Sequence, residues 1–144
     1  MPARLFETES EEETIALGRR LACELPARGV VLLIGNLGAG KTTLAKGIVE
    51  GRGAAPADEV ASPTFTLIHE FGKVYHIDLY RLDEESEVAT LGLEEIFDRD
   101  ALVLIEWGER FPRLLPNDRT EIRIDADSGE RRRIAVTEIQ NKHE

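Results

Sequence analysis

This sequence has a single cysteine, no long apolar run, and no extended apolar stretch at its start. Its only cysteine is Cys23, which excludes an intramolecular disulfide framework and fits a reducing cytoplasm. No apolar run approaches the ~20 residues that a bilayer-spanning helix needs. Residues Met1 to Glu7 lack the apolar core of a signal peptide. We therefore expect a cytoplasmic protein without a membrane segment.

Basic residues are scarce relative to acidic ones. The chain has 18 Lys and Arg against 28 Asp and Glu, which gives a formal net charge of −10. Because neutralising nucleic-acid phosphates needs a basic face, this balance argues against broad, direct binding to nucleic acid. The acidity either keeps the protein dissolved or matches a basic protein partner, and both interpretations stay open.

The dominant motif lies at residues 35–42, Gly-Asn-Leu-Gly-Ala-Gly-Lys-Thr, and fits G-x-x-x-x-G-K-[ST]. Glycines let the backbone N–H groups of such a loop turn inward around a phosphate. Lys41 would then reach the β- and γ-phosphates, and the Thr42 hydroxyl would bind Mg²⁺. The nucleotide-binding residues predicted from this loop are Asn36, Leu37, Gly38, Ala39, Gly40, Lys41, Thr42 and Thr43.

The flanks of this motif match what a phosphate-binding loop requires. Residues 30–34 form an unbroken apolar run, as in a buried parallel strand, and residues 43–50 have the pattern of a helix. An ordinary glycine-rich turn between a strand and a helix is the plainer alternative. A helix from the N-cap Ser10 to about Leu25 is predicted to precede the strand.

The rest of the chain predicts a P-loop unit followed by antiparallel hairpins. Gly72 and Lys73 form the first hairpin turn, and Gly92 breaks an acidic helical stretch from Asp83 to Asp98. Strands are expected at residues 66–71, 74–78, 101–106, 121–125 and 132–139. We therefore expect one α/β domain over residues 1–144, a three-layer P-loop NTPase-like domain with a mixed β-sheet. Residues 139–144 are expected to form a frayed tail.

Two acids end apolar strands and are candidates for holding Mg²⁺. Glu106 closes the run 102–106, and Asp78 closes the run 74–77. Open α/β sheets bind ligands beyond the carboxyl ends of their strands, so both carboxylates could face the phosphates. The predicted metal ligands are Thr42, Glu106 and Asp78, and the predicted catalytic residues are Lys41, Asp78 and Glu106. The plainer alternative is that each acid caps a helix or pairs with Arg81.

Several parts of a fast nucleotide hydrolase are missing from the sequence. There is no N-K-x-D motif for guanine and no identifiable catalytic glutamine. Nothing in the sequence directs Arg81, Arg110 or Arg113 at a γ-phosphate. By analogy with unassisted P-loop switches, we expect slow turnover, roughly 10⁻⁴ to 10⁻² s⁻¹.

Four segments together carry a resemblance to a known family. They are G-N-L-G-A-G-K-T-T at residues 35–43, S-P-T-F-T-L at 62–67, Y-H-I-D-L-Y-R-L at 75–82 and L-I-E-W at 104–107. In order and spacing the chain resembles, over about residues 5–125, the bacterial ATPases of tRNA threonylcarbamoyladenosine biosynthesis, the TsaE/YjeE family. Asn36 departs from the Asp that many members of the family carry, and the resemblance is not traced into the chain after Asp125.

The resemblance implies a Mg-ATP-dependent ATPase that acts with the TsaD–TsaB complex to modify tRNA. It implies that Lys41 binds phosphate, that Thr42 and Glu106 bind Mg²⁺, and that Asp78 serves the metal or its water. It also implies that the segment from Thr8 to Ser10 approaches the adenine, which adds Ser10 to the cofactor-binding residues, and that Thr64 lies in a switch-like loop.

Two other function classes remain open at this stage. One is a small-molecule or nucleotide kinase that uses the same phosphate loop. The other is an assembly module that is gated by nucleotide and needs no hydrolysis. The basic triplet at residues 131–133 is expected to be exposed to solvent, with a partner or tRNA contact as the alternative.

Overall fold

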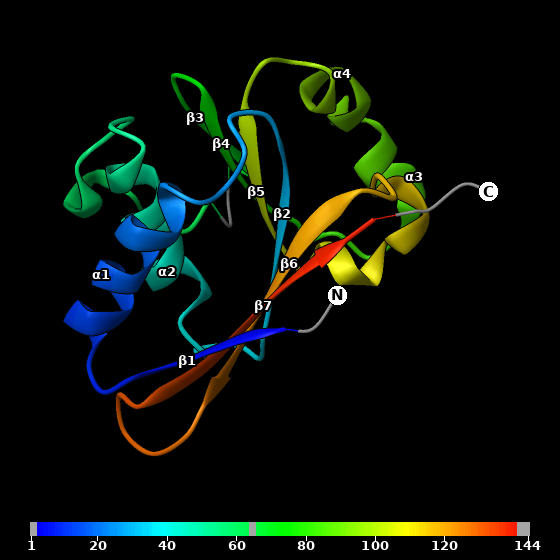
Figure 1. Cartoon of the computed structure of the whole chain (residues 1–144). Helices are drawn as coiled ribbons and strands as arrows, with labels where there is room; N and C mark the ends of the chain where they lie inside the picture. The colour runs from blue at the N-terminus through cyan, green and yellow to red at the C-terminus, as the bar shows by residue number, and fades with distance from the viewer. Residues whose placement is uncertain (1–2, 64–65, 141–144) are drawn as a thin grey trace.

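The computed structural model describes residues 3–63 and 66–140 and shows a seven-stranded sheet with helices on both faces (Figure 1). The strand order is β1-β7-β6-β2-β5-β4-β3. The strands are β1 (Arg4–Thr8), β2 (Gly29–Ile34), β3 (Ile68–Phe71), β4 (Val74–Asp78), β5 (Leu102–Glu106), β6 (Arg119–Ala126) and β7 (Arg132–Ile139). Parallel and antiparallel pairs coexist, so the predicted α/β class with a mixed sheet is confirmed.

The middle of the sheet is parallel and almost inaccessible to solvent. β2 lies between β5 and β6 and is parallel to both, and β4 is parallel to β5. Val31 and Leu33 are 0 % exposed on one face, and Leu32 is 1 % exposed on the other. Burial on both faces explains the unbroken apolar run in the sequence. The carboxyl ends of these four strands therefore meet at one edge of the sheet.

One helical layer consists of α1 (Glu11–Ala22) and α2 (Lys41–Gly51), which pack at very close range. A Cβ atom on Gly47 would lie 2.0 Å from the carbonyl oxygen of Ile15 and 2.9 Å from the Cα of Gly18. Glycine is therefore required where the two helices cross. α1 ends at Ala22, earlier than the predicted Leu25.

The sequence Ser10-Glu11-Glu12-Glu13 fits a capping box, in which the Glu13 carboxylate would accept the Ser10 N–H, but the start of α1 differs from it in one detail. The Ser10 hydroxyl accepts the N–H of Glu13 at 3.1 Å, as expected of an N-cap. The Glu13 carboxylate, however, accepts the N–H of Glu9 at 2.9 Å rather than that of Ser10. The cap is therefore anchored one residue further back, in the segment that leads out of β1.

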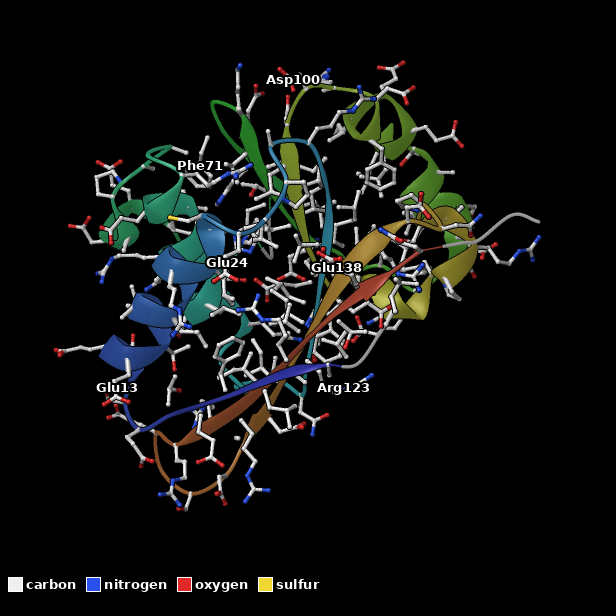
Figure 2. All side chains as sticks on the ribbon, in the orientation of Figure 1. Glu13, Glu24, Phe71, Asp100, Arg123 and Glu138 are labelled. Carbon is white, nitrogen blue, oxygen red and sulfur yellow. The ribbon has the colours of Figure 1, made fainter. Side chains whose placement is uncertain are left out.

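The second layer is made of the short helices α3 (Glu85–Ala89) and α4 (Leu93–Phe97), with the 3₁₀ turns η2 (Gly108–Arg110) and η3 (Pro112–Leu114). The break at Gly92 is confirmed, because this residue adopts a φ of 71° between the two helices. In Figure 2 side chains fill the space between the sheet and its helices, while the labelled Glu13 and Asp100 lie at the outside.

Both predicted hairpins are present, and one strand was not predicted. β3 pairs antiparallel with β4, and β6 pairs antiparallel with β7. The additional strand, β1, pairs with β7 at the edge of the sheet. Its Leu5 is 77 % exposed, so no apolar face was visible in the sequence. Ile139 still pairs with Arg119, so the predicted tail begins inside β7.

A third 3₁₀ turn, η1 (Ala57–Glu59), follows α2. None of the helices in the described chain has both the length and the apolar character that crossing a membrane demands.

Candidate functional site

A cavity of about 510 Å³ opens at the carboxyl edge of the parallel strands. Eight residues predicted from sequence line it: Leu37, Gly38, Gly40, Lys41, Thr42, Thr43, Asp78 and Glu106. They come from the loop after β2, from the start of α2 and from the ends of β4 and β5. The fold therefore brings residues that are up to 69 positions apart in sequence (106 − 37) into one cavity.

The glycine loop between β2 and α2 depends on backbone conformations that favour glycine. Gly38 and Gly40 have φ values of 79° and 110°. Within the loop, the Ala39 N–H donates to the Asn36 carbonyl at 3.0 Å. The Ala39 side chain is 3 % exposed and packs in the core, whereas the Asn36 side chain is exposed. Neither of these two residues is among those that line the cavity.

Lys41 is the buried cation of the cavity. Lys41 is only 4 % exposed, and its Nζ donates a hydrogen bond to the Gly35 carbonyl at 2.8 Å. The same Nζ lies 3.4 Å from the ring centroid of Trp107. Burial lowers the pKa of Lys41, and the carboxylates of Glu106, Glu109 and Asp78 oppose that shift. An anion bound in the cavity would stabilise the charged form of Lys41, which burial disfavours.

The two strand-end acids lie side by side, because Asp78 and Glu106 are register partners in the parallel β4–β5 pair. Each is 3 % exposed. The Thr42 hydroxyl donates to Oε2 of Glu106 at 2.9 Å. Asp78 accepts the Ser62 hydroxyl at 3.1 Å and the Tyr80 N–H at 2.8 Å. Both carboxylates are therefore held in fixed orientations beside the glycine loop.

The donor set suits a hard divalent cation. Mg²⁺ prefers oxygen ligands and usually takes only one or two from protein, completing its shell with phosphate and water. The Thr42 hydroxyl and the Glu106 carboxylate converge on one point and supply such oxygens. Among the described residues, no group of three or more His, Cys, Asp or Glu side chains could hold a metal by itself.

Residues outside the predicted catalytic, metal and nucleotide-binding sets also line the cavity. The rings of Trp107 and Tyr80 contact each other in a tilted arrangement, with centroids 5.1 Å apart and planes at 57°, on the side of Glu106. On the opposite side, the lining comes from α1 and from the β6–β7 hairpin, through Glu11, Thr14, Glu130 and Arg132. No sequence signal marked these four residues, because they are polar and come in two pairs that lie far apart in the chain.

Two other predicted positions have different placements. Ser10 lies outside the cavity lining and serves as the N-cap of α1, although its neighbours Glu11 and Thr14 reach the cavity. Thr64 lies outside the described residues, and so does Phe65. Ser62, at the start of the same motif, lines the cavity through its contact with Asp78.

A parallel-centred sheet, a glycine loop between β2 and α2, and acids at the ends of adjacent strands together define a P-loop NTPase-like α/β protein. The family model described as "Threonylcarbamoyl adenosine biosynthesis protein TsaE" matches residues 8–134, so the similarity extends past Asp125, where the sequence alone had shown none. The chain belongs to this TsaE family.

Individual relatives agree with this assignment. The chain is similar to the tRNA threonylcarbamoyladenosine biosynthesis protein TsaE of Bacillus subtilis (strain 168), with 38 % identity over 143 residues, 96 % of this chain and 88 % of the relative. The protein of the same name from Nostoc sp. is 46 % identical over 110 residues, 71 % of this chain and 66 % of the relative.

A solved structure is also similar. The crystal structure of YdiB from Bacillus subtilis has a TM-score of 0.77 and 32 % sequence identity. The comparison covers 96 % of this chain and 86 % of that one.

Proposed function

We propose that this chain is a cytoplasmic P-loop ATPase that binds Mg-ATP, hydrolyses it slowly and acts with the TsaD–TsaB complex in tRNA threonylcarbamoyladenosine biosynthesis. Family membership supports the pathway. The observation that carries the nucleotide chemistry is the convergence of Lys41, Thr42 and Glu106 in one cavity beside the glycine loop.

Phosphate binding would begin with Lys41. Its ammonium group is buried, lies over the Trp107 ring, and donates a hydrogen bond to the neutral carbonyl of Gly35. A phosphate offers it a charged acceptor, and charge-assisted hydrogen bonds are roughly twice as strong as neutral ones. The positive end of α2, which begins at Lys41, faces the same cavity and would add to the attraction.

Glu106 and Asp78 would have different roles, in binding Mg²⁺ and in orienting a water. Mg²⁺ supplies charge neutralisation at the phosphates when it is bound. Thr42 and Glu106 would hold it, because their oxygens already meet at 2.9 Å. Asp78 would orient a water, since Ser62 and the Tyr80 N–H fix its carboxylate next to Glu106. Such positioning of charge and water is most of what phosphoryl transfer requires from a protein.

The arginine positions support slow turnover in the absence of a partner. Among the described residues that line the cavity, the one arginine is Arg132, and it comes from β7 rather than from the side of Glu106. Arg110 donates to the carbonyl of Tyr80 at 3.1 Å and pairs with Asp83. An arginine that stabilises the transferring phosphate would then be supplied by the partner, which would couple hydrolysis to assembly.

The test is ATP turnover of the purified chain, alone and with the TsaD–TsaB pair and tRNA. Lys41→Ala and Glu106→Ala are measured alongside the parent chain. We expect slow turnover alone, stimulation by the pair, and a fall of at least ~100-fold in both variants, as is typical when a group that stabilises the transition state is removed. Turnover that the pair leaves unchanged would contradict the role in this pathway.

Two further readouts separate the alternatives. Phosphorylation of an added acceptor in an ATP-dependent screen would favour a kinase. Assembly with the pair that requires ATP, yet tolerates Asp78→Asn and Glu106→Gln, would favour a module in which nucleotide binding alone drives association.

A further inference from the structure

Arg131 precedes β7, Arg132 and Arg133 begin it, and the structure gives the three side chains different partners. Arg131 forms a two-pronged hydrogen bond to the Glu9 carboxylate, with distances of 3.0 to 3.2 Å. Arg133 pairs with Asp127 at 3.5 Å. Arg132 donates to the carbonyl oxygens of Gly129 and Arg131, at 2.7 and 2.9 Å. Among the described residues, no carboxylate pairs with Arg132.

The alternation of β7 explains why Arg132 faces a different way. Side chains two apart share one face of a strand. Ile134 and Val136 lie on the same face as Arg132 and pack in the core beneath α1 and α2. Arg132 is therefore the first member of an inward-facing row, and it lines the cavity, whereas Arg131 and Arg133 are exposed.

The guanidinium of Arg132 lies against the glycine loop. A Cβ atom placed on Gly40 would be 3.4 Å from the Arg132 Nε and 3.8 Å from its Cδ. Gly40 immediately precedes Lys41, where α2 begins. The loop therefore has a buried cation, Lys41, facing Trp107 on one side, and a second cation, Arg132, on the other.

The sheet order shows which end of a bound nucleotide Arg132 would meet. β2 carries the glycine loop, β5 and β4 with their acids lie on one side of it, and β6 lies on the other. β6 is parallel to β2, so the β6–β7 turn lies at the same edge as the cavity. A nucleotide whose terminal phosphate lies beside Thr42 and Glu106 would extend its α-phosphate and nucleoside toward this turn.

We propose that Arg132 is a nucleotide-binding residue whose guanidinium binds the α-phosphate, at the end of the nucleotide remote from Mg²⁺. The inference rests on the proposed function. Arginine suits this task because its planar fork offers several N–H groups to phosphate oxygens. The two carbonyl contacts hold the side chain against the loop before a ligand arrives, which limits the loss of side-chain freedom on binding. Glu130, which lines the same part of the cavity, is engaged with the N–H of Glu11 at 2.9 Å.

The experiment compares Arg132→Gln and Arg132→Lys with the parent chain by calorimetric titration of ADP with and without Mg²⁺. AMP and adenosine are measured by competition against a fluorescent ADP analogue. Arg133→Gln is the matched control, because it lies on the same hairpin, faces solvent and pairs with Asp127. Thermal unfolding of each variant checks that the hairpin is intact.

We expect Arg132→Gln to weaken the affinity for ADP and for AMP by about tenfold each. Arg132→Lys should lose less affinity because it keeps the positive charge. Arg133→Gln should leave both affinities unchanged. The loss should persist without Mg²⁺, and adenosine should bind Arg132→Gln as it binds the parent. Equal losses for AMP and adenosine would overturn the phosphate contact in favour of stacking on the base. Unchanged ADP affinity in Arg132→Gln would overturn the inference alone, whereas a parent chain that binds no nucleotide would overturn the proposed function with it.

Discussion

The Nε2 of His76 lies 2.6 Å from the Oε2 of Glu106, between the adjacent strands β4 and β5. His76 is completely buried. With Glu106 as an ionised carboxylate, which only accepts hydrogen bonds, the Nε2–H tautomer of His76 is the one that donates in this pair. The same oxygen accepts the Thr42 hydroxyl, so two donors fix one carboxylate. The Nδ1 of His76 has no hydrogen-bond partner within the described chain, which leaves Glu106 as the polar contact of this ring.

His76 is therefore expected to act as a positioning residue for Glu106. His76→Leu leaves a buried carboxylate with one donor fewer, and should lower the free energy of unfolding by about 1–3 kcal/mol. It should also raise the Mg²⁺ concentration needed for half-maximal nucleotide binding. His76→Gln, which restores a donor, should recover part of that Mg²⁺ dependence. Mg²⁺ titrations that are identical for the parent and both variants would contradict this role.

Trp107 should report on Lys41 through its fluorescence. It is the only tryptophan in the chain, and the Lys41 ammonium lies 3.4 Å from its ring centroid. A phosphate that draws this cation away changes the field at the indole, so ADP should change the emission of the parent chain. Lys41→Met should alter the emission without ligand and abolish the response to ADP. A full response in Lys41→Met would show that the two side chains are not coupled.

The crossing of α1 and α2 should tolerate no side chain at Gly47. An added Cβ would lie 2.0 Å from a carbonyl oxygen, so Gly47→Ala must force the helices apart and should cost about 3 kcal/mol of unfolding free energy. Gly53→Ala is the control, because its Cβ meets nothing within 4 Å and only its positive φ is strained, at about 1 kcal/mol. Denaturant unfolding measures both, and equal losses would contradict the packing argument.

The acidic surface of α3 and α4 should govern assembly with a basic partner. Glu87 accepts the N–H groups of Asp83 and Glu84, so reversing charge there would also disrupt the start of α3. The better variant reverses exposed residues outside this contact, Glu85, Glu94 and Glu95. Because the chain has a net charge of −10, its affinity for the TsaD–TsaB pair should fall as salt increases. If tRNA uses the same basic surface of the pair, the chain should also displace tRNA less effectively as salt increases.

The triple reversal should weaken this assembly and flatten its salt dependence. Its control reverses three exposed acids on other elements, Glu12, Glu59 and Glu138. Assembly that responds equally to both triple variants would mean that only the overall charge matters. An affinity that does not change with salt concentration would contradict an electrostatic docking surface.

The parts of the fold that depend on local pattern could be predicted from sequence. The apolar run of β2 and the break at Gly92 both appear where the residues indicated them. β1 could not be predicted, because an edge strand with Leu5 facing solvent has no alternating apolar face. It exists because β7 offers it a partner from the other end of the sequence.

Some residues of the cavity could likewise be predicted from the sequence, and others could not. The glycine loop and the strand-end acids are local signals, and the structure brings them together. The contact of His76 with Glu106 could not be predicted, because it depends on the register of β4 against β5. Arg132 was visible only as part of a basic triplet, since the sequence does not show which of three arginines faces inward.

The place of β1 in the sheet has a consequence for synthesis on the ribosome. β1 is the first strand of the chain, yet its neighbour in the sheet is β7, the last strand in chain order. The α1–α2 pair and the glycine loop can emerge and begin to pack early, because domains start to fold as they leave the ribosome. The cavity wall that contains Arg132 cannot form until residues through the end of β7 have been made. A nascent chain shorter than this would expose the inner face of β6 and leave β1 unpaired, which is the stage at which chaperones would be most needed.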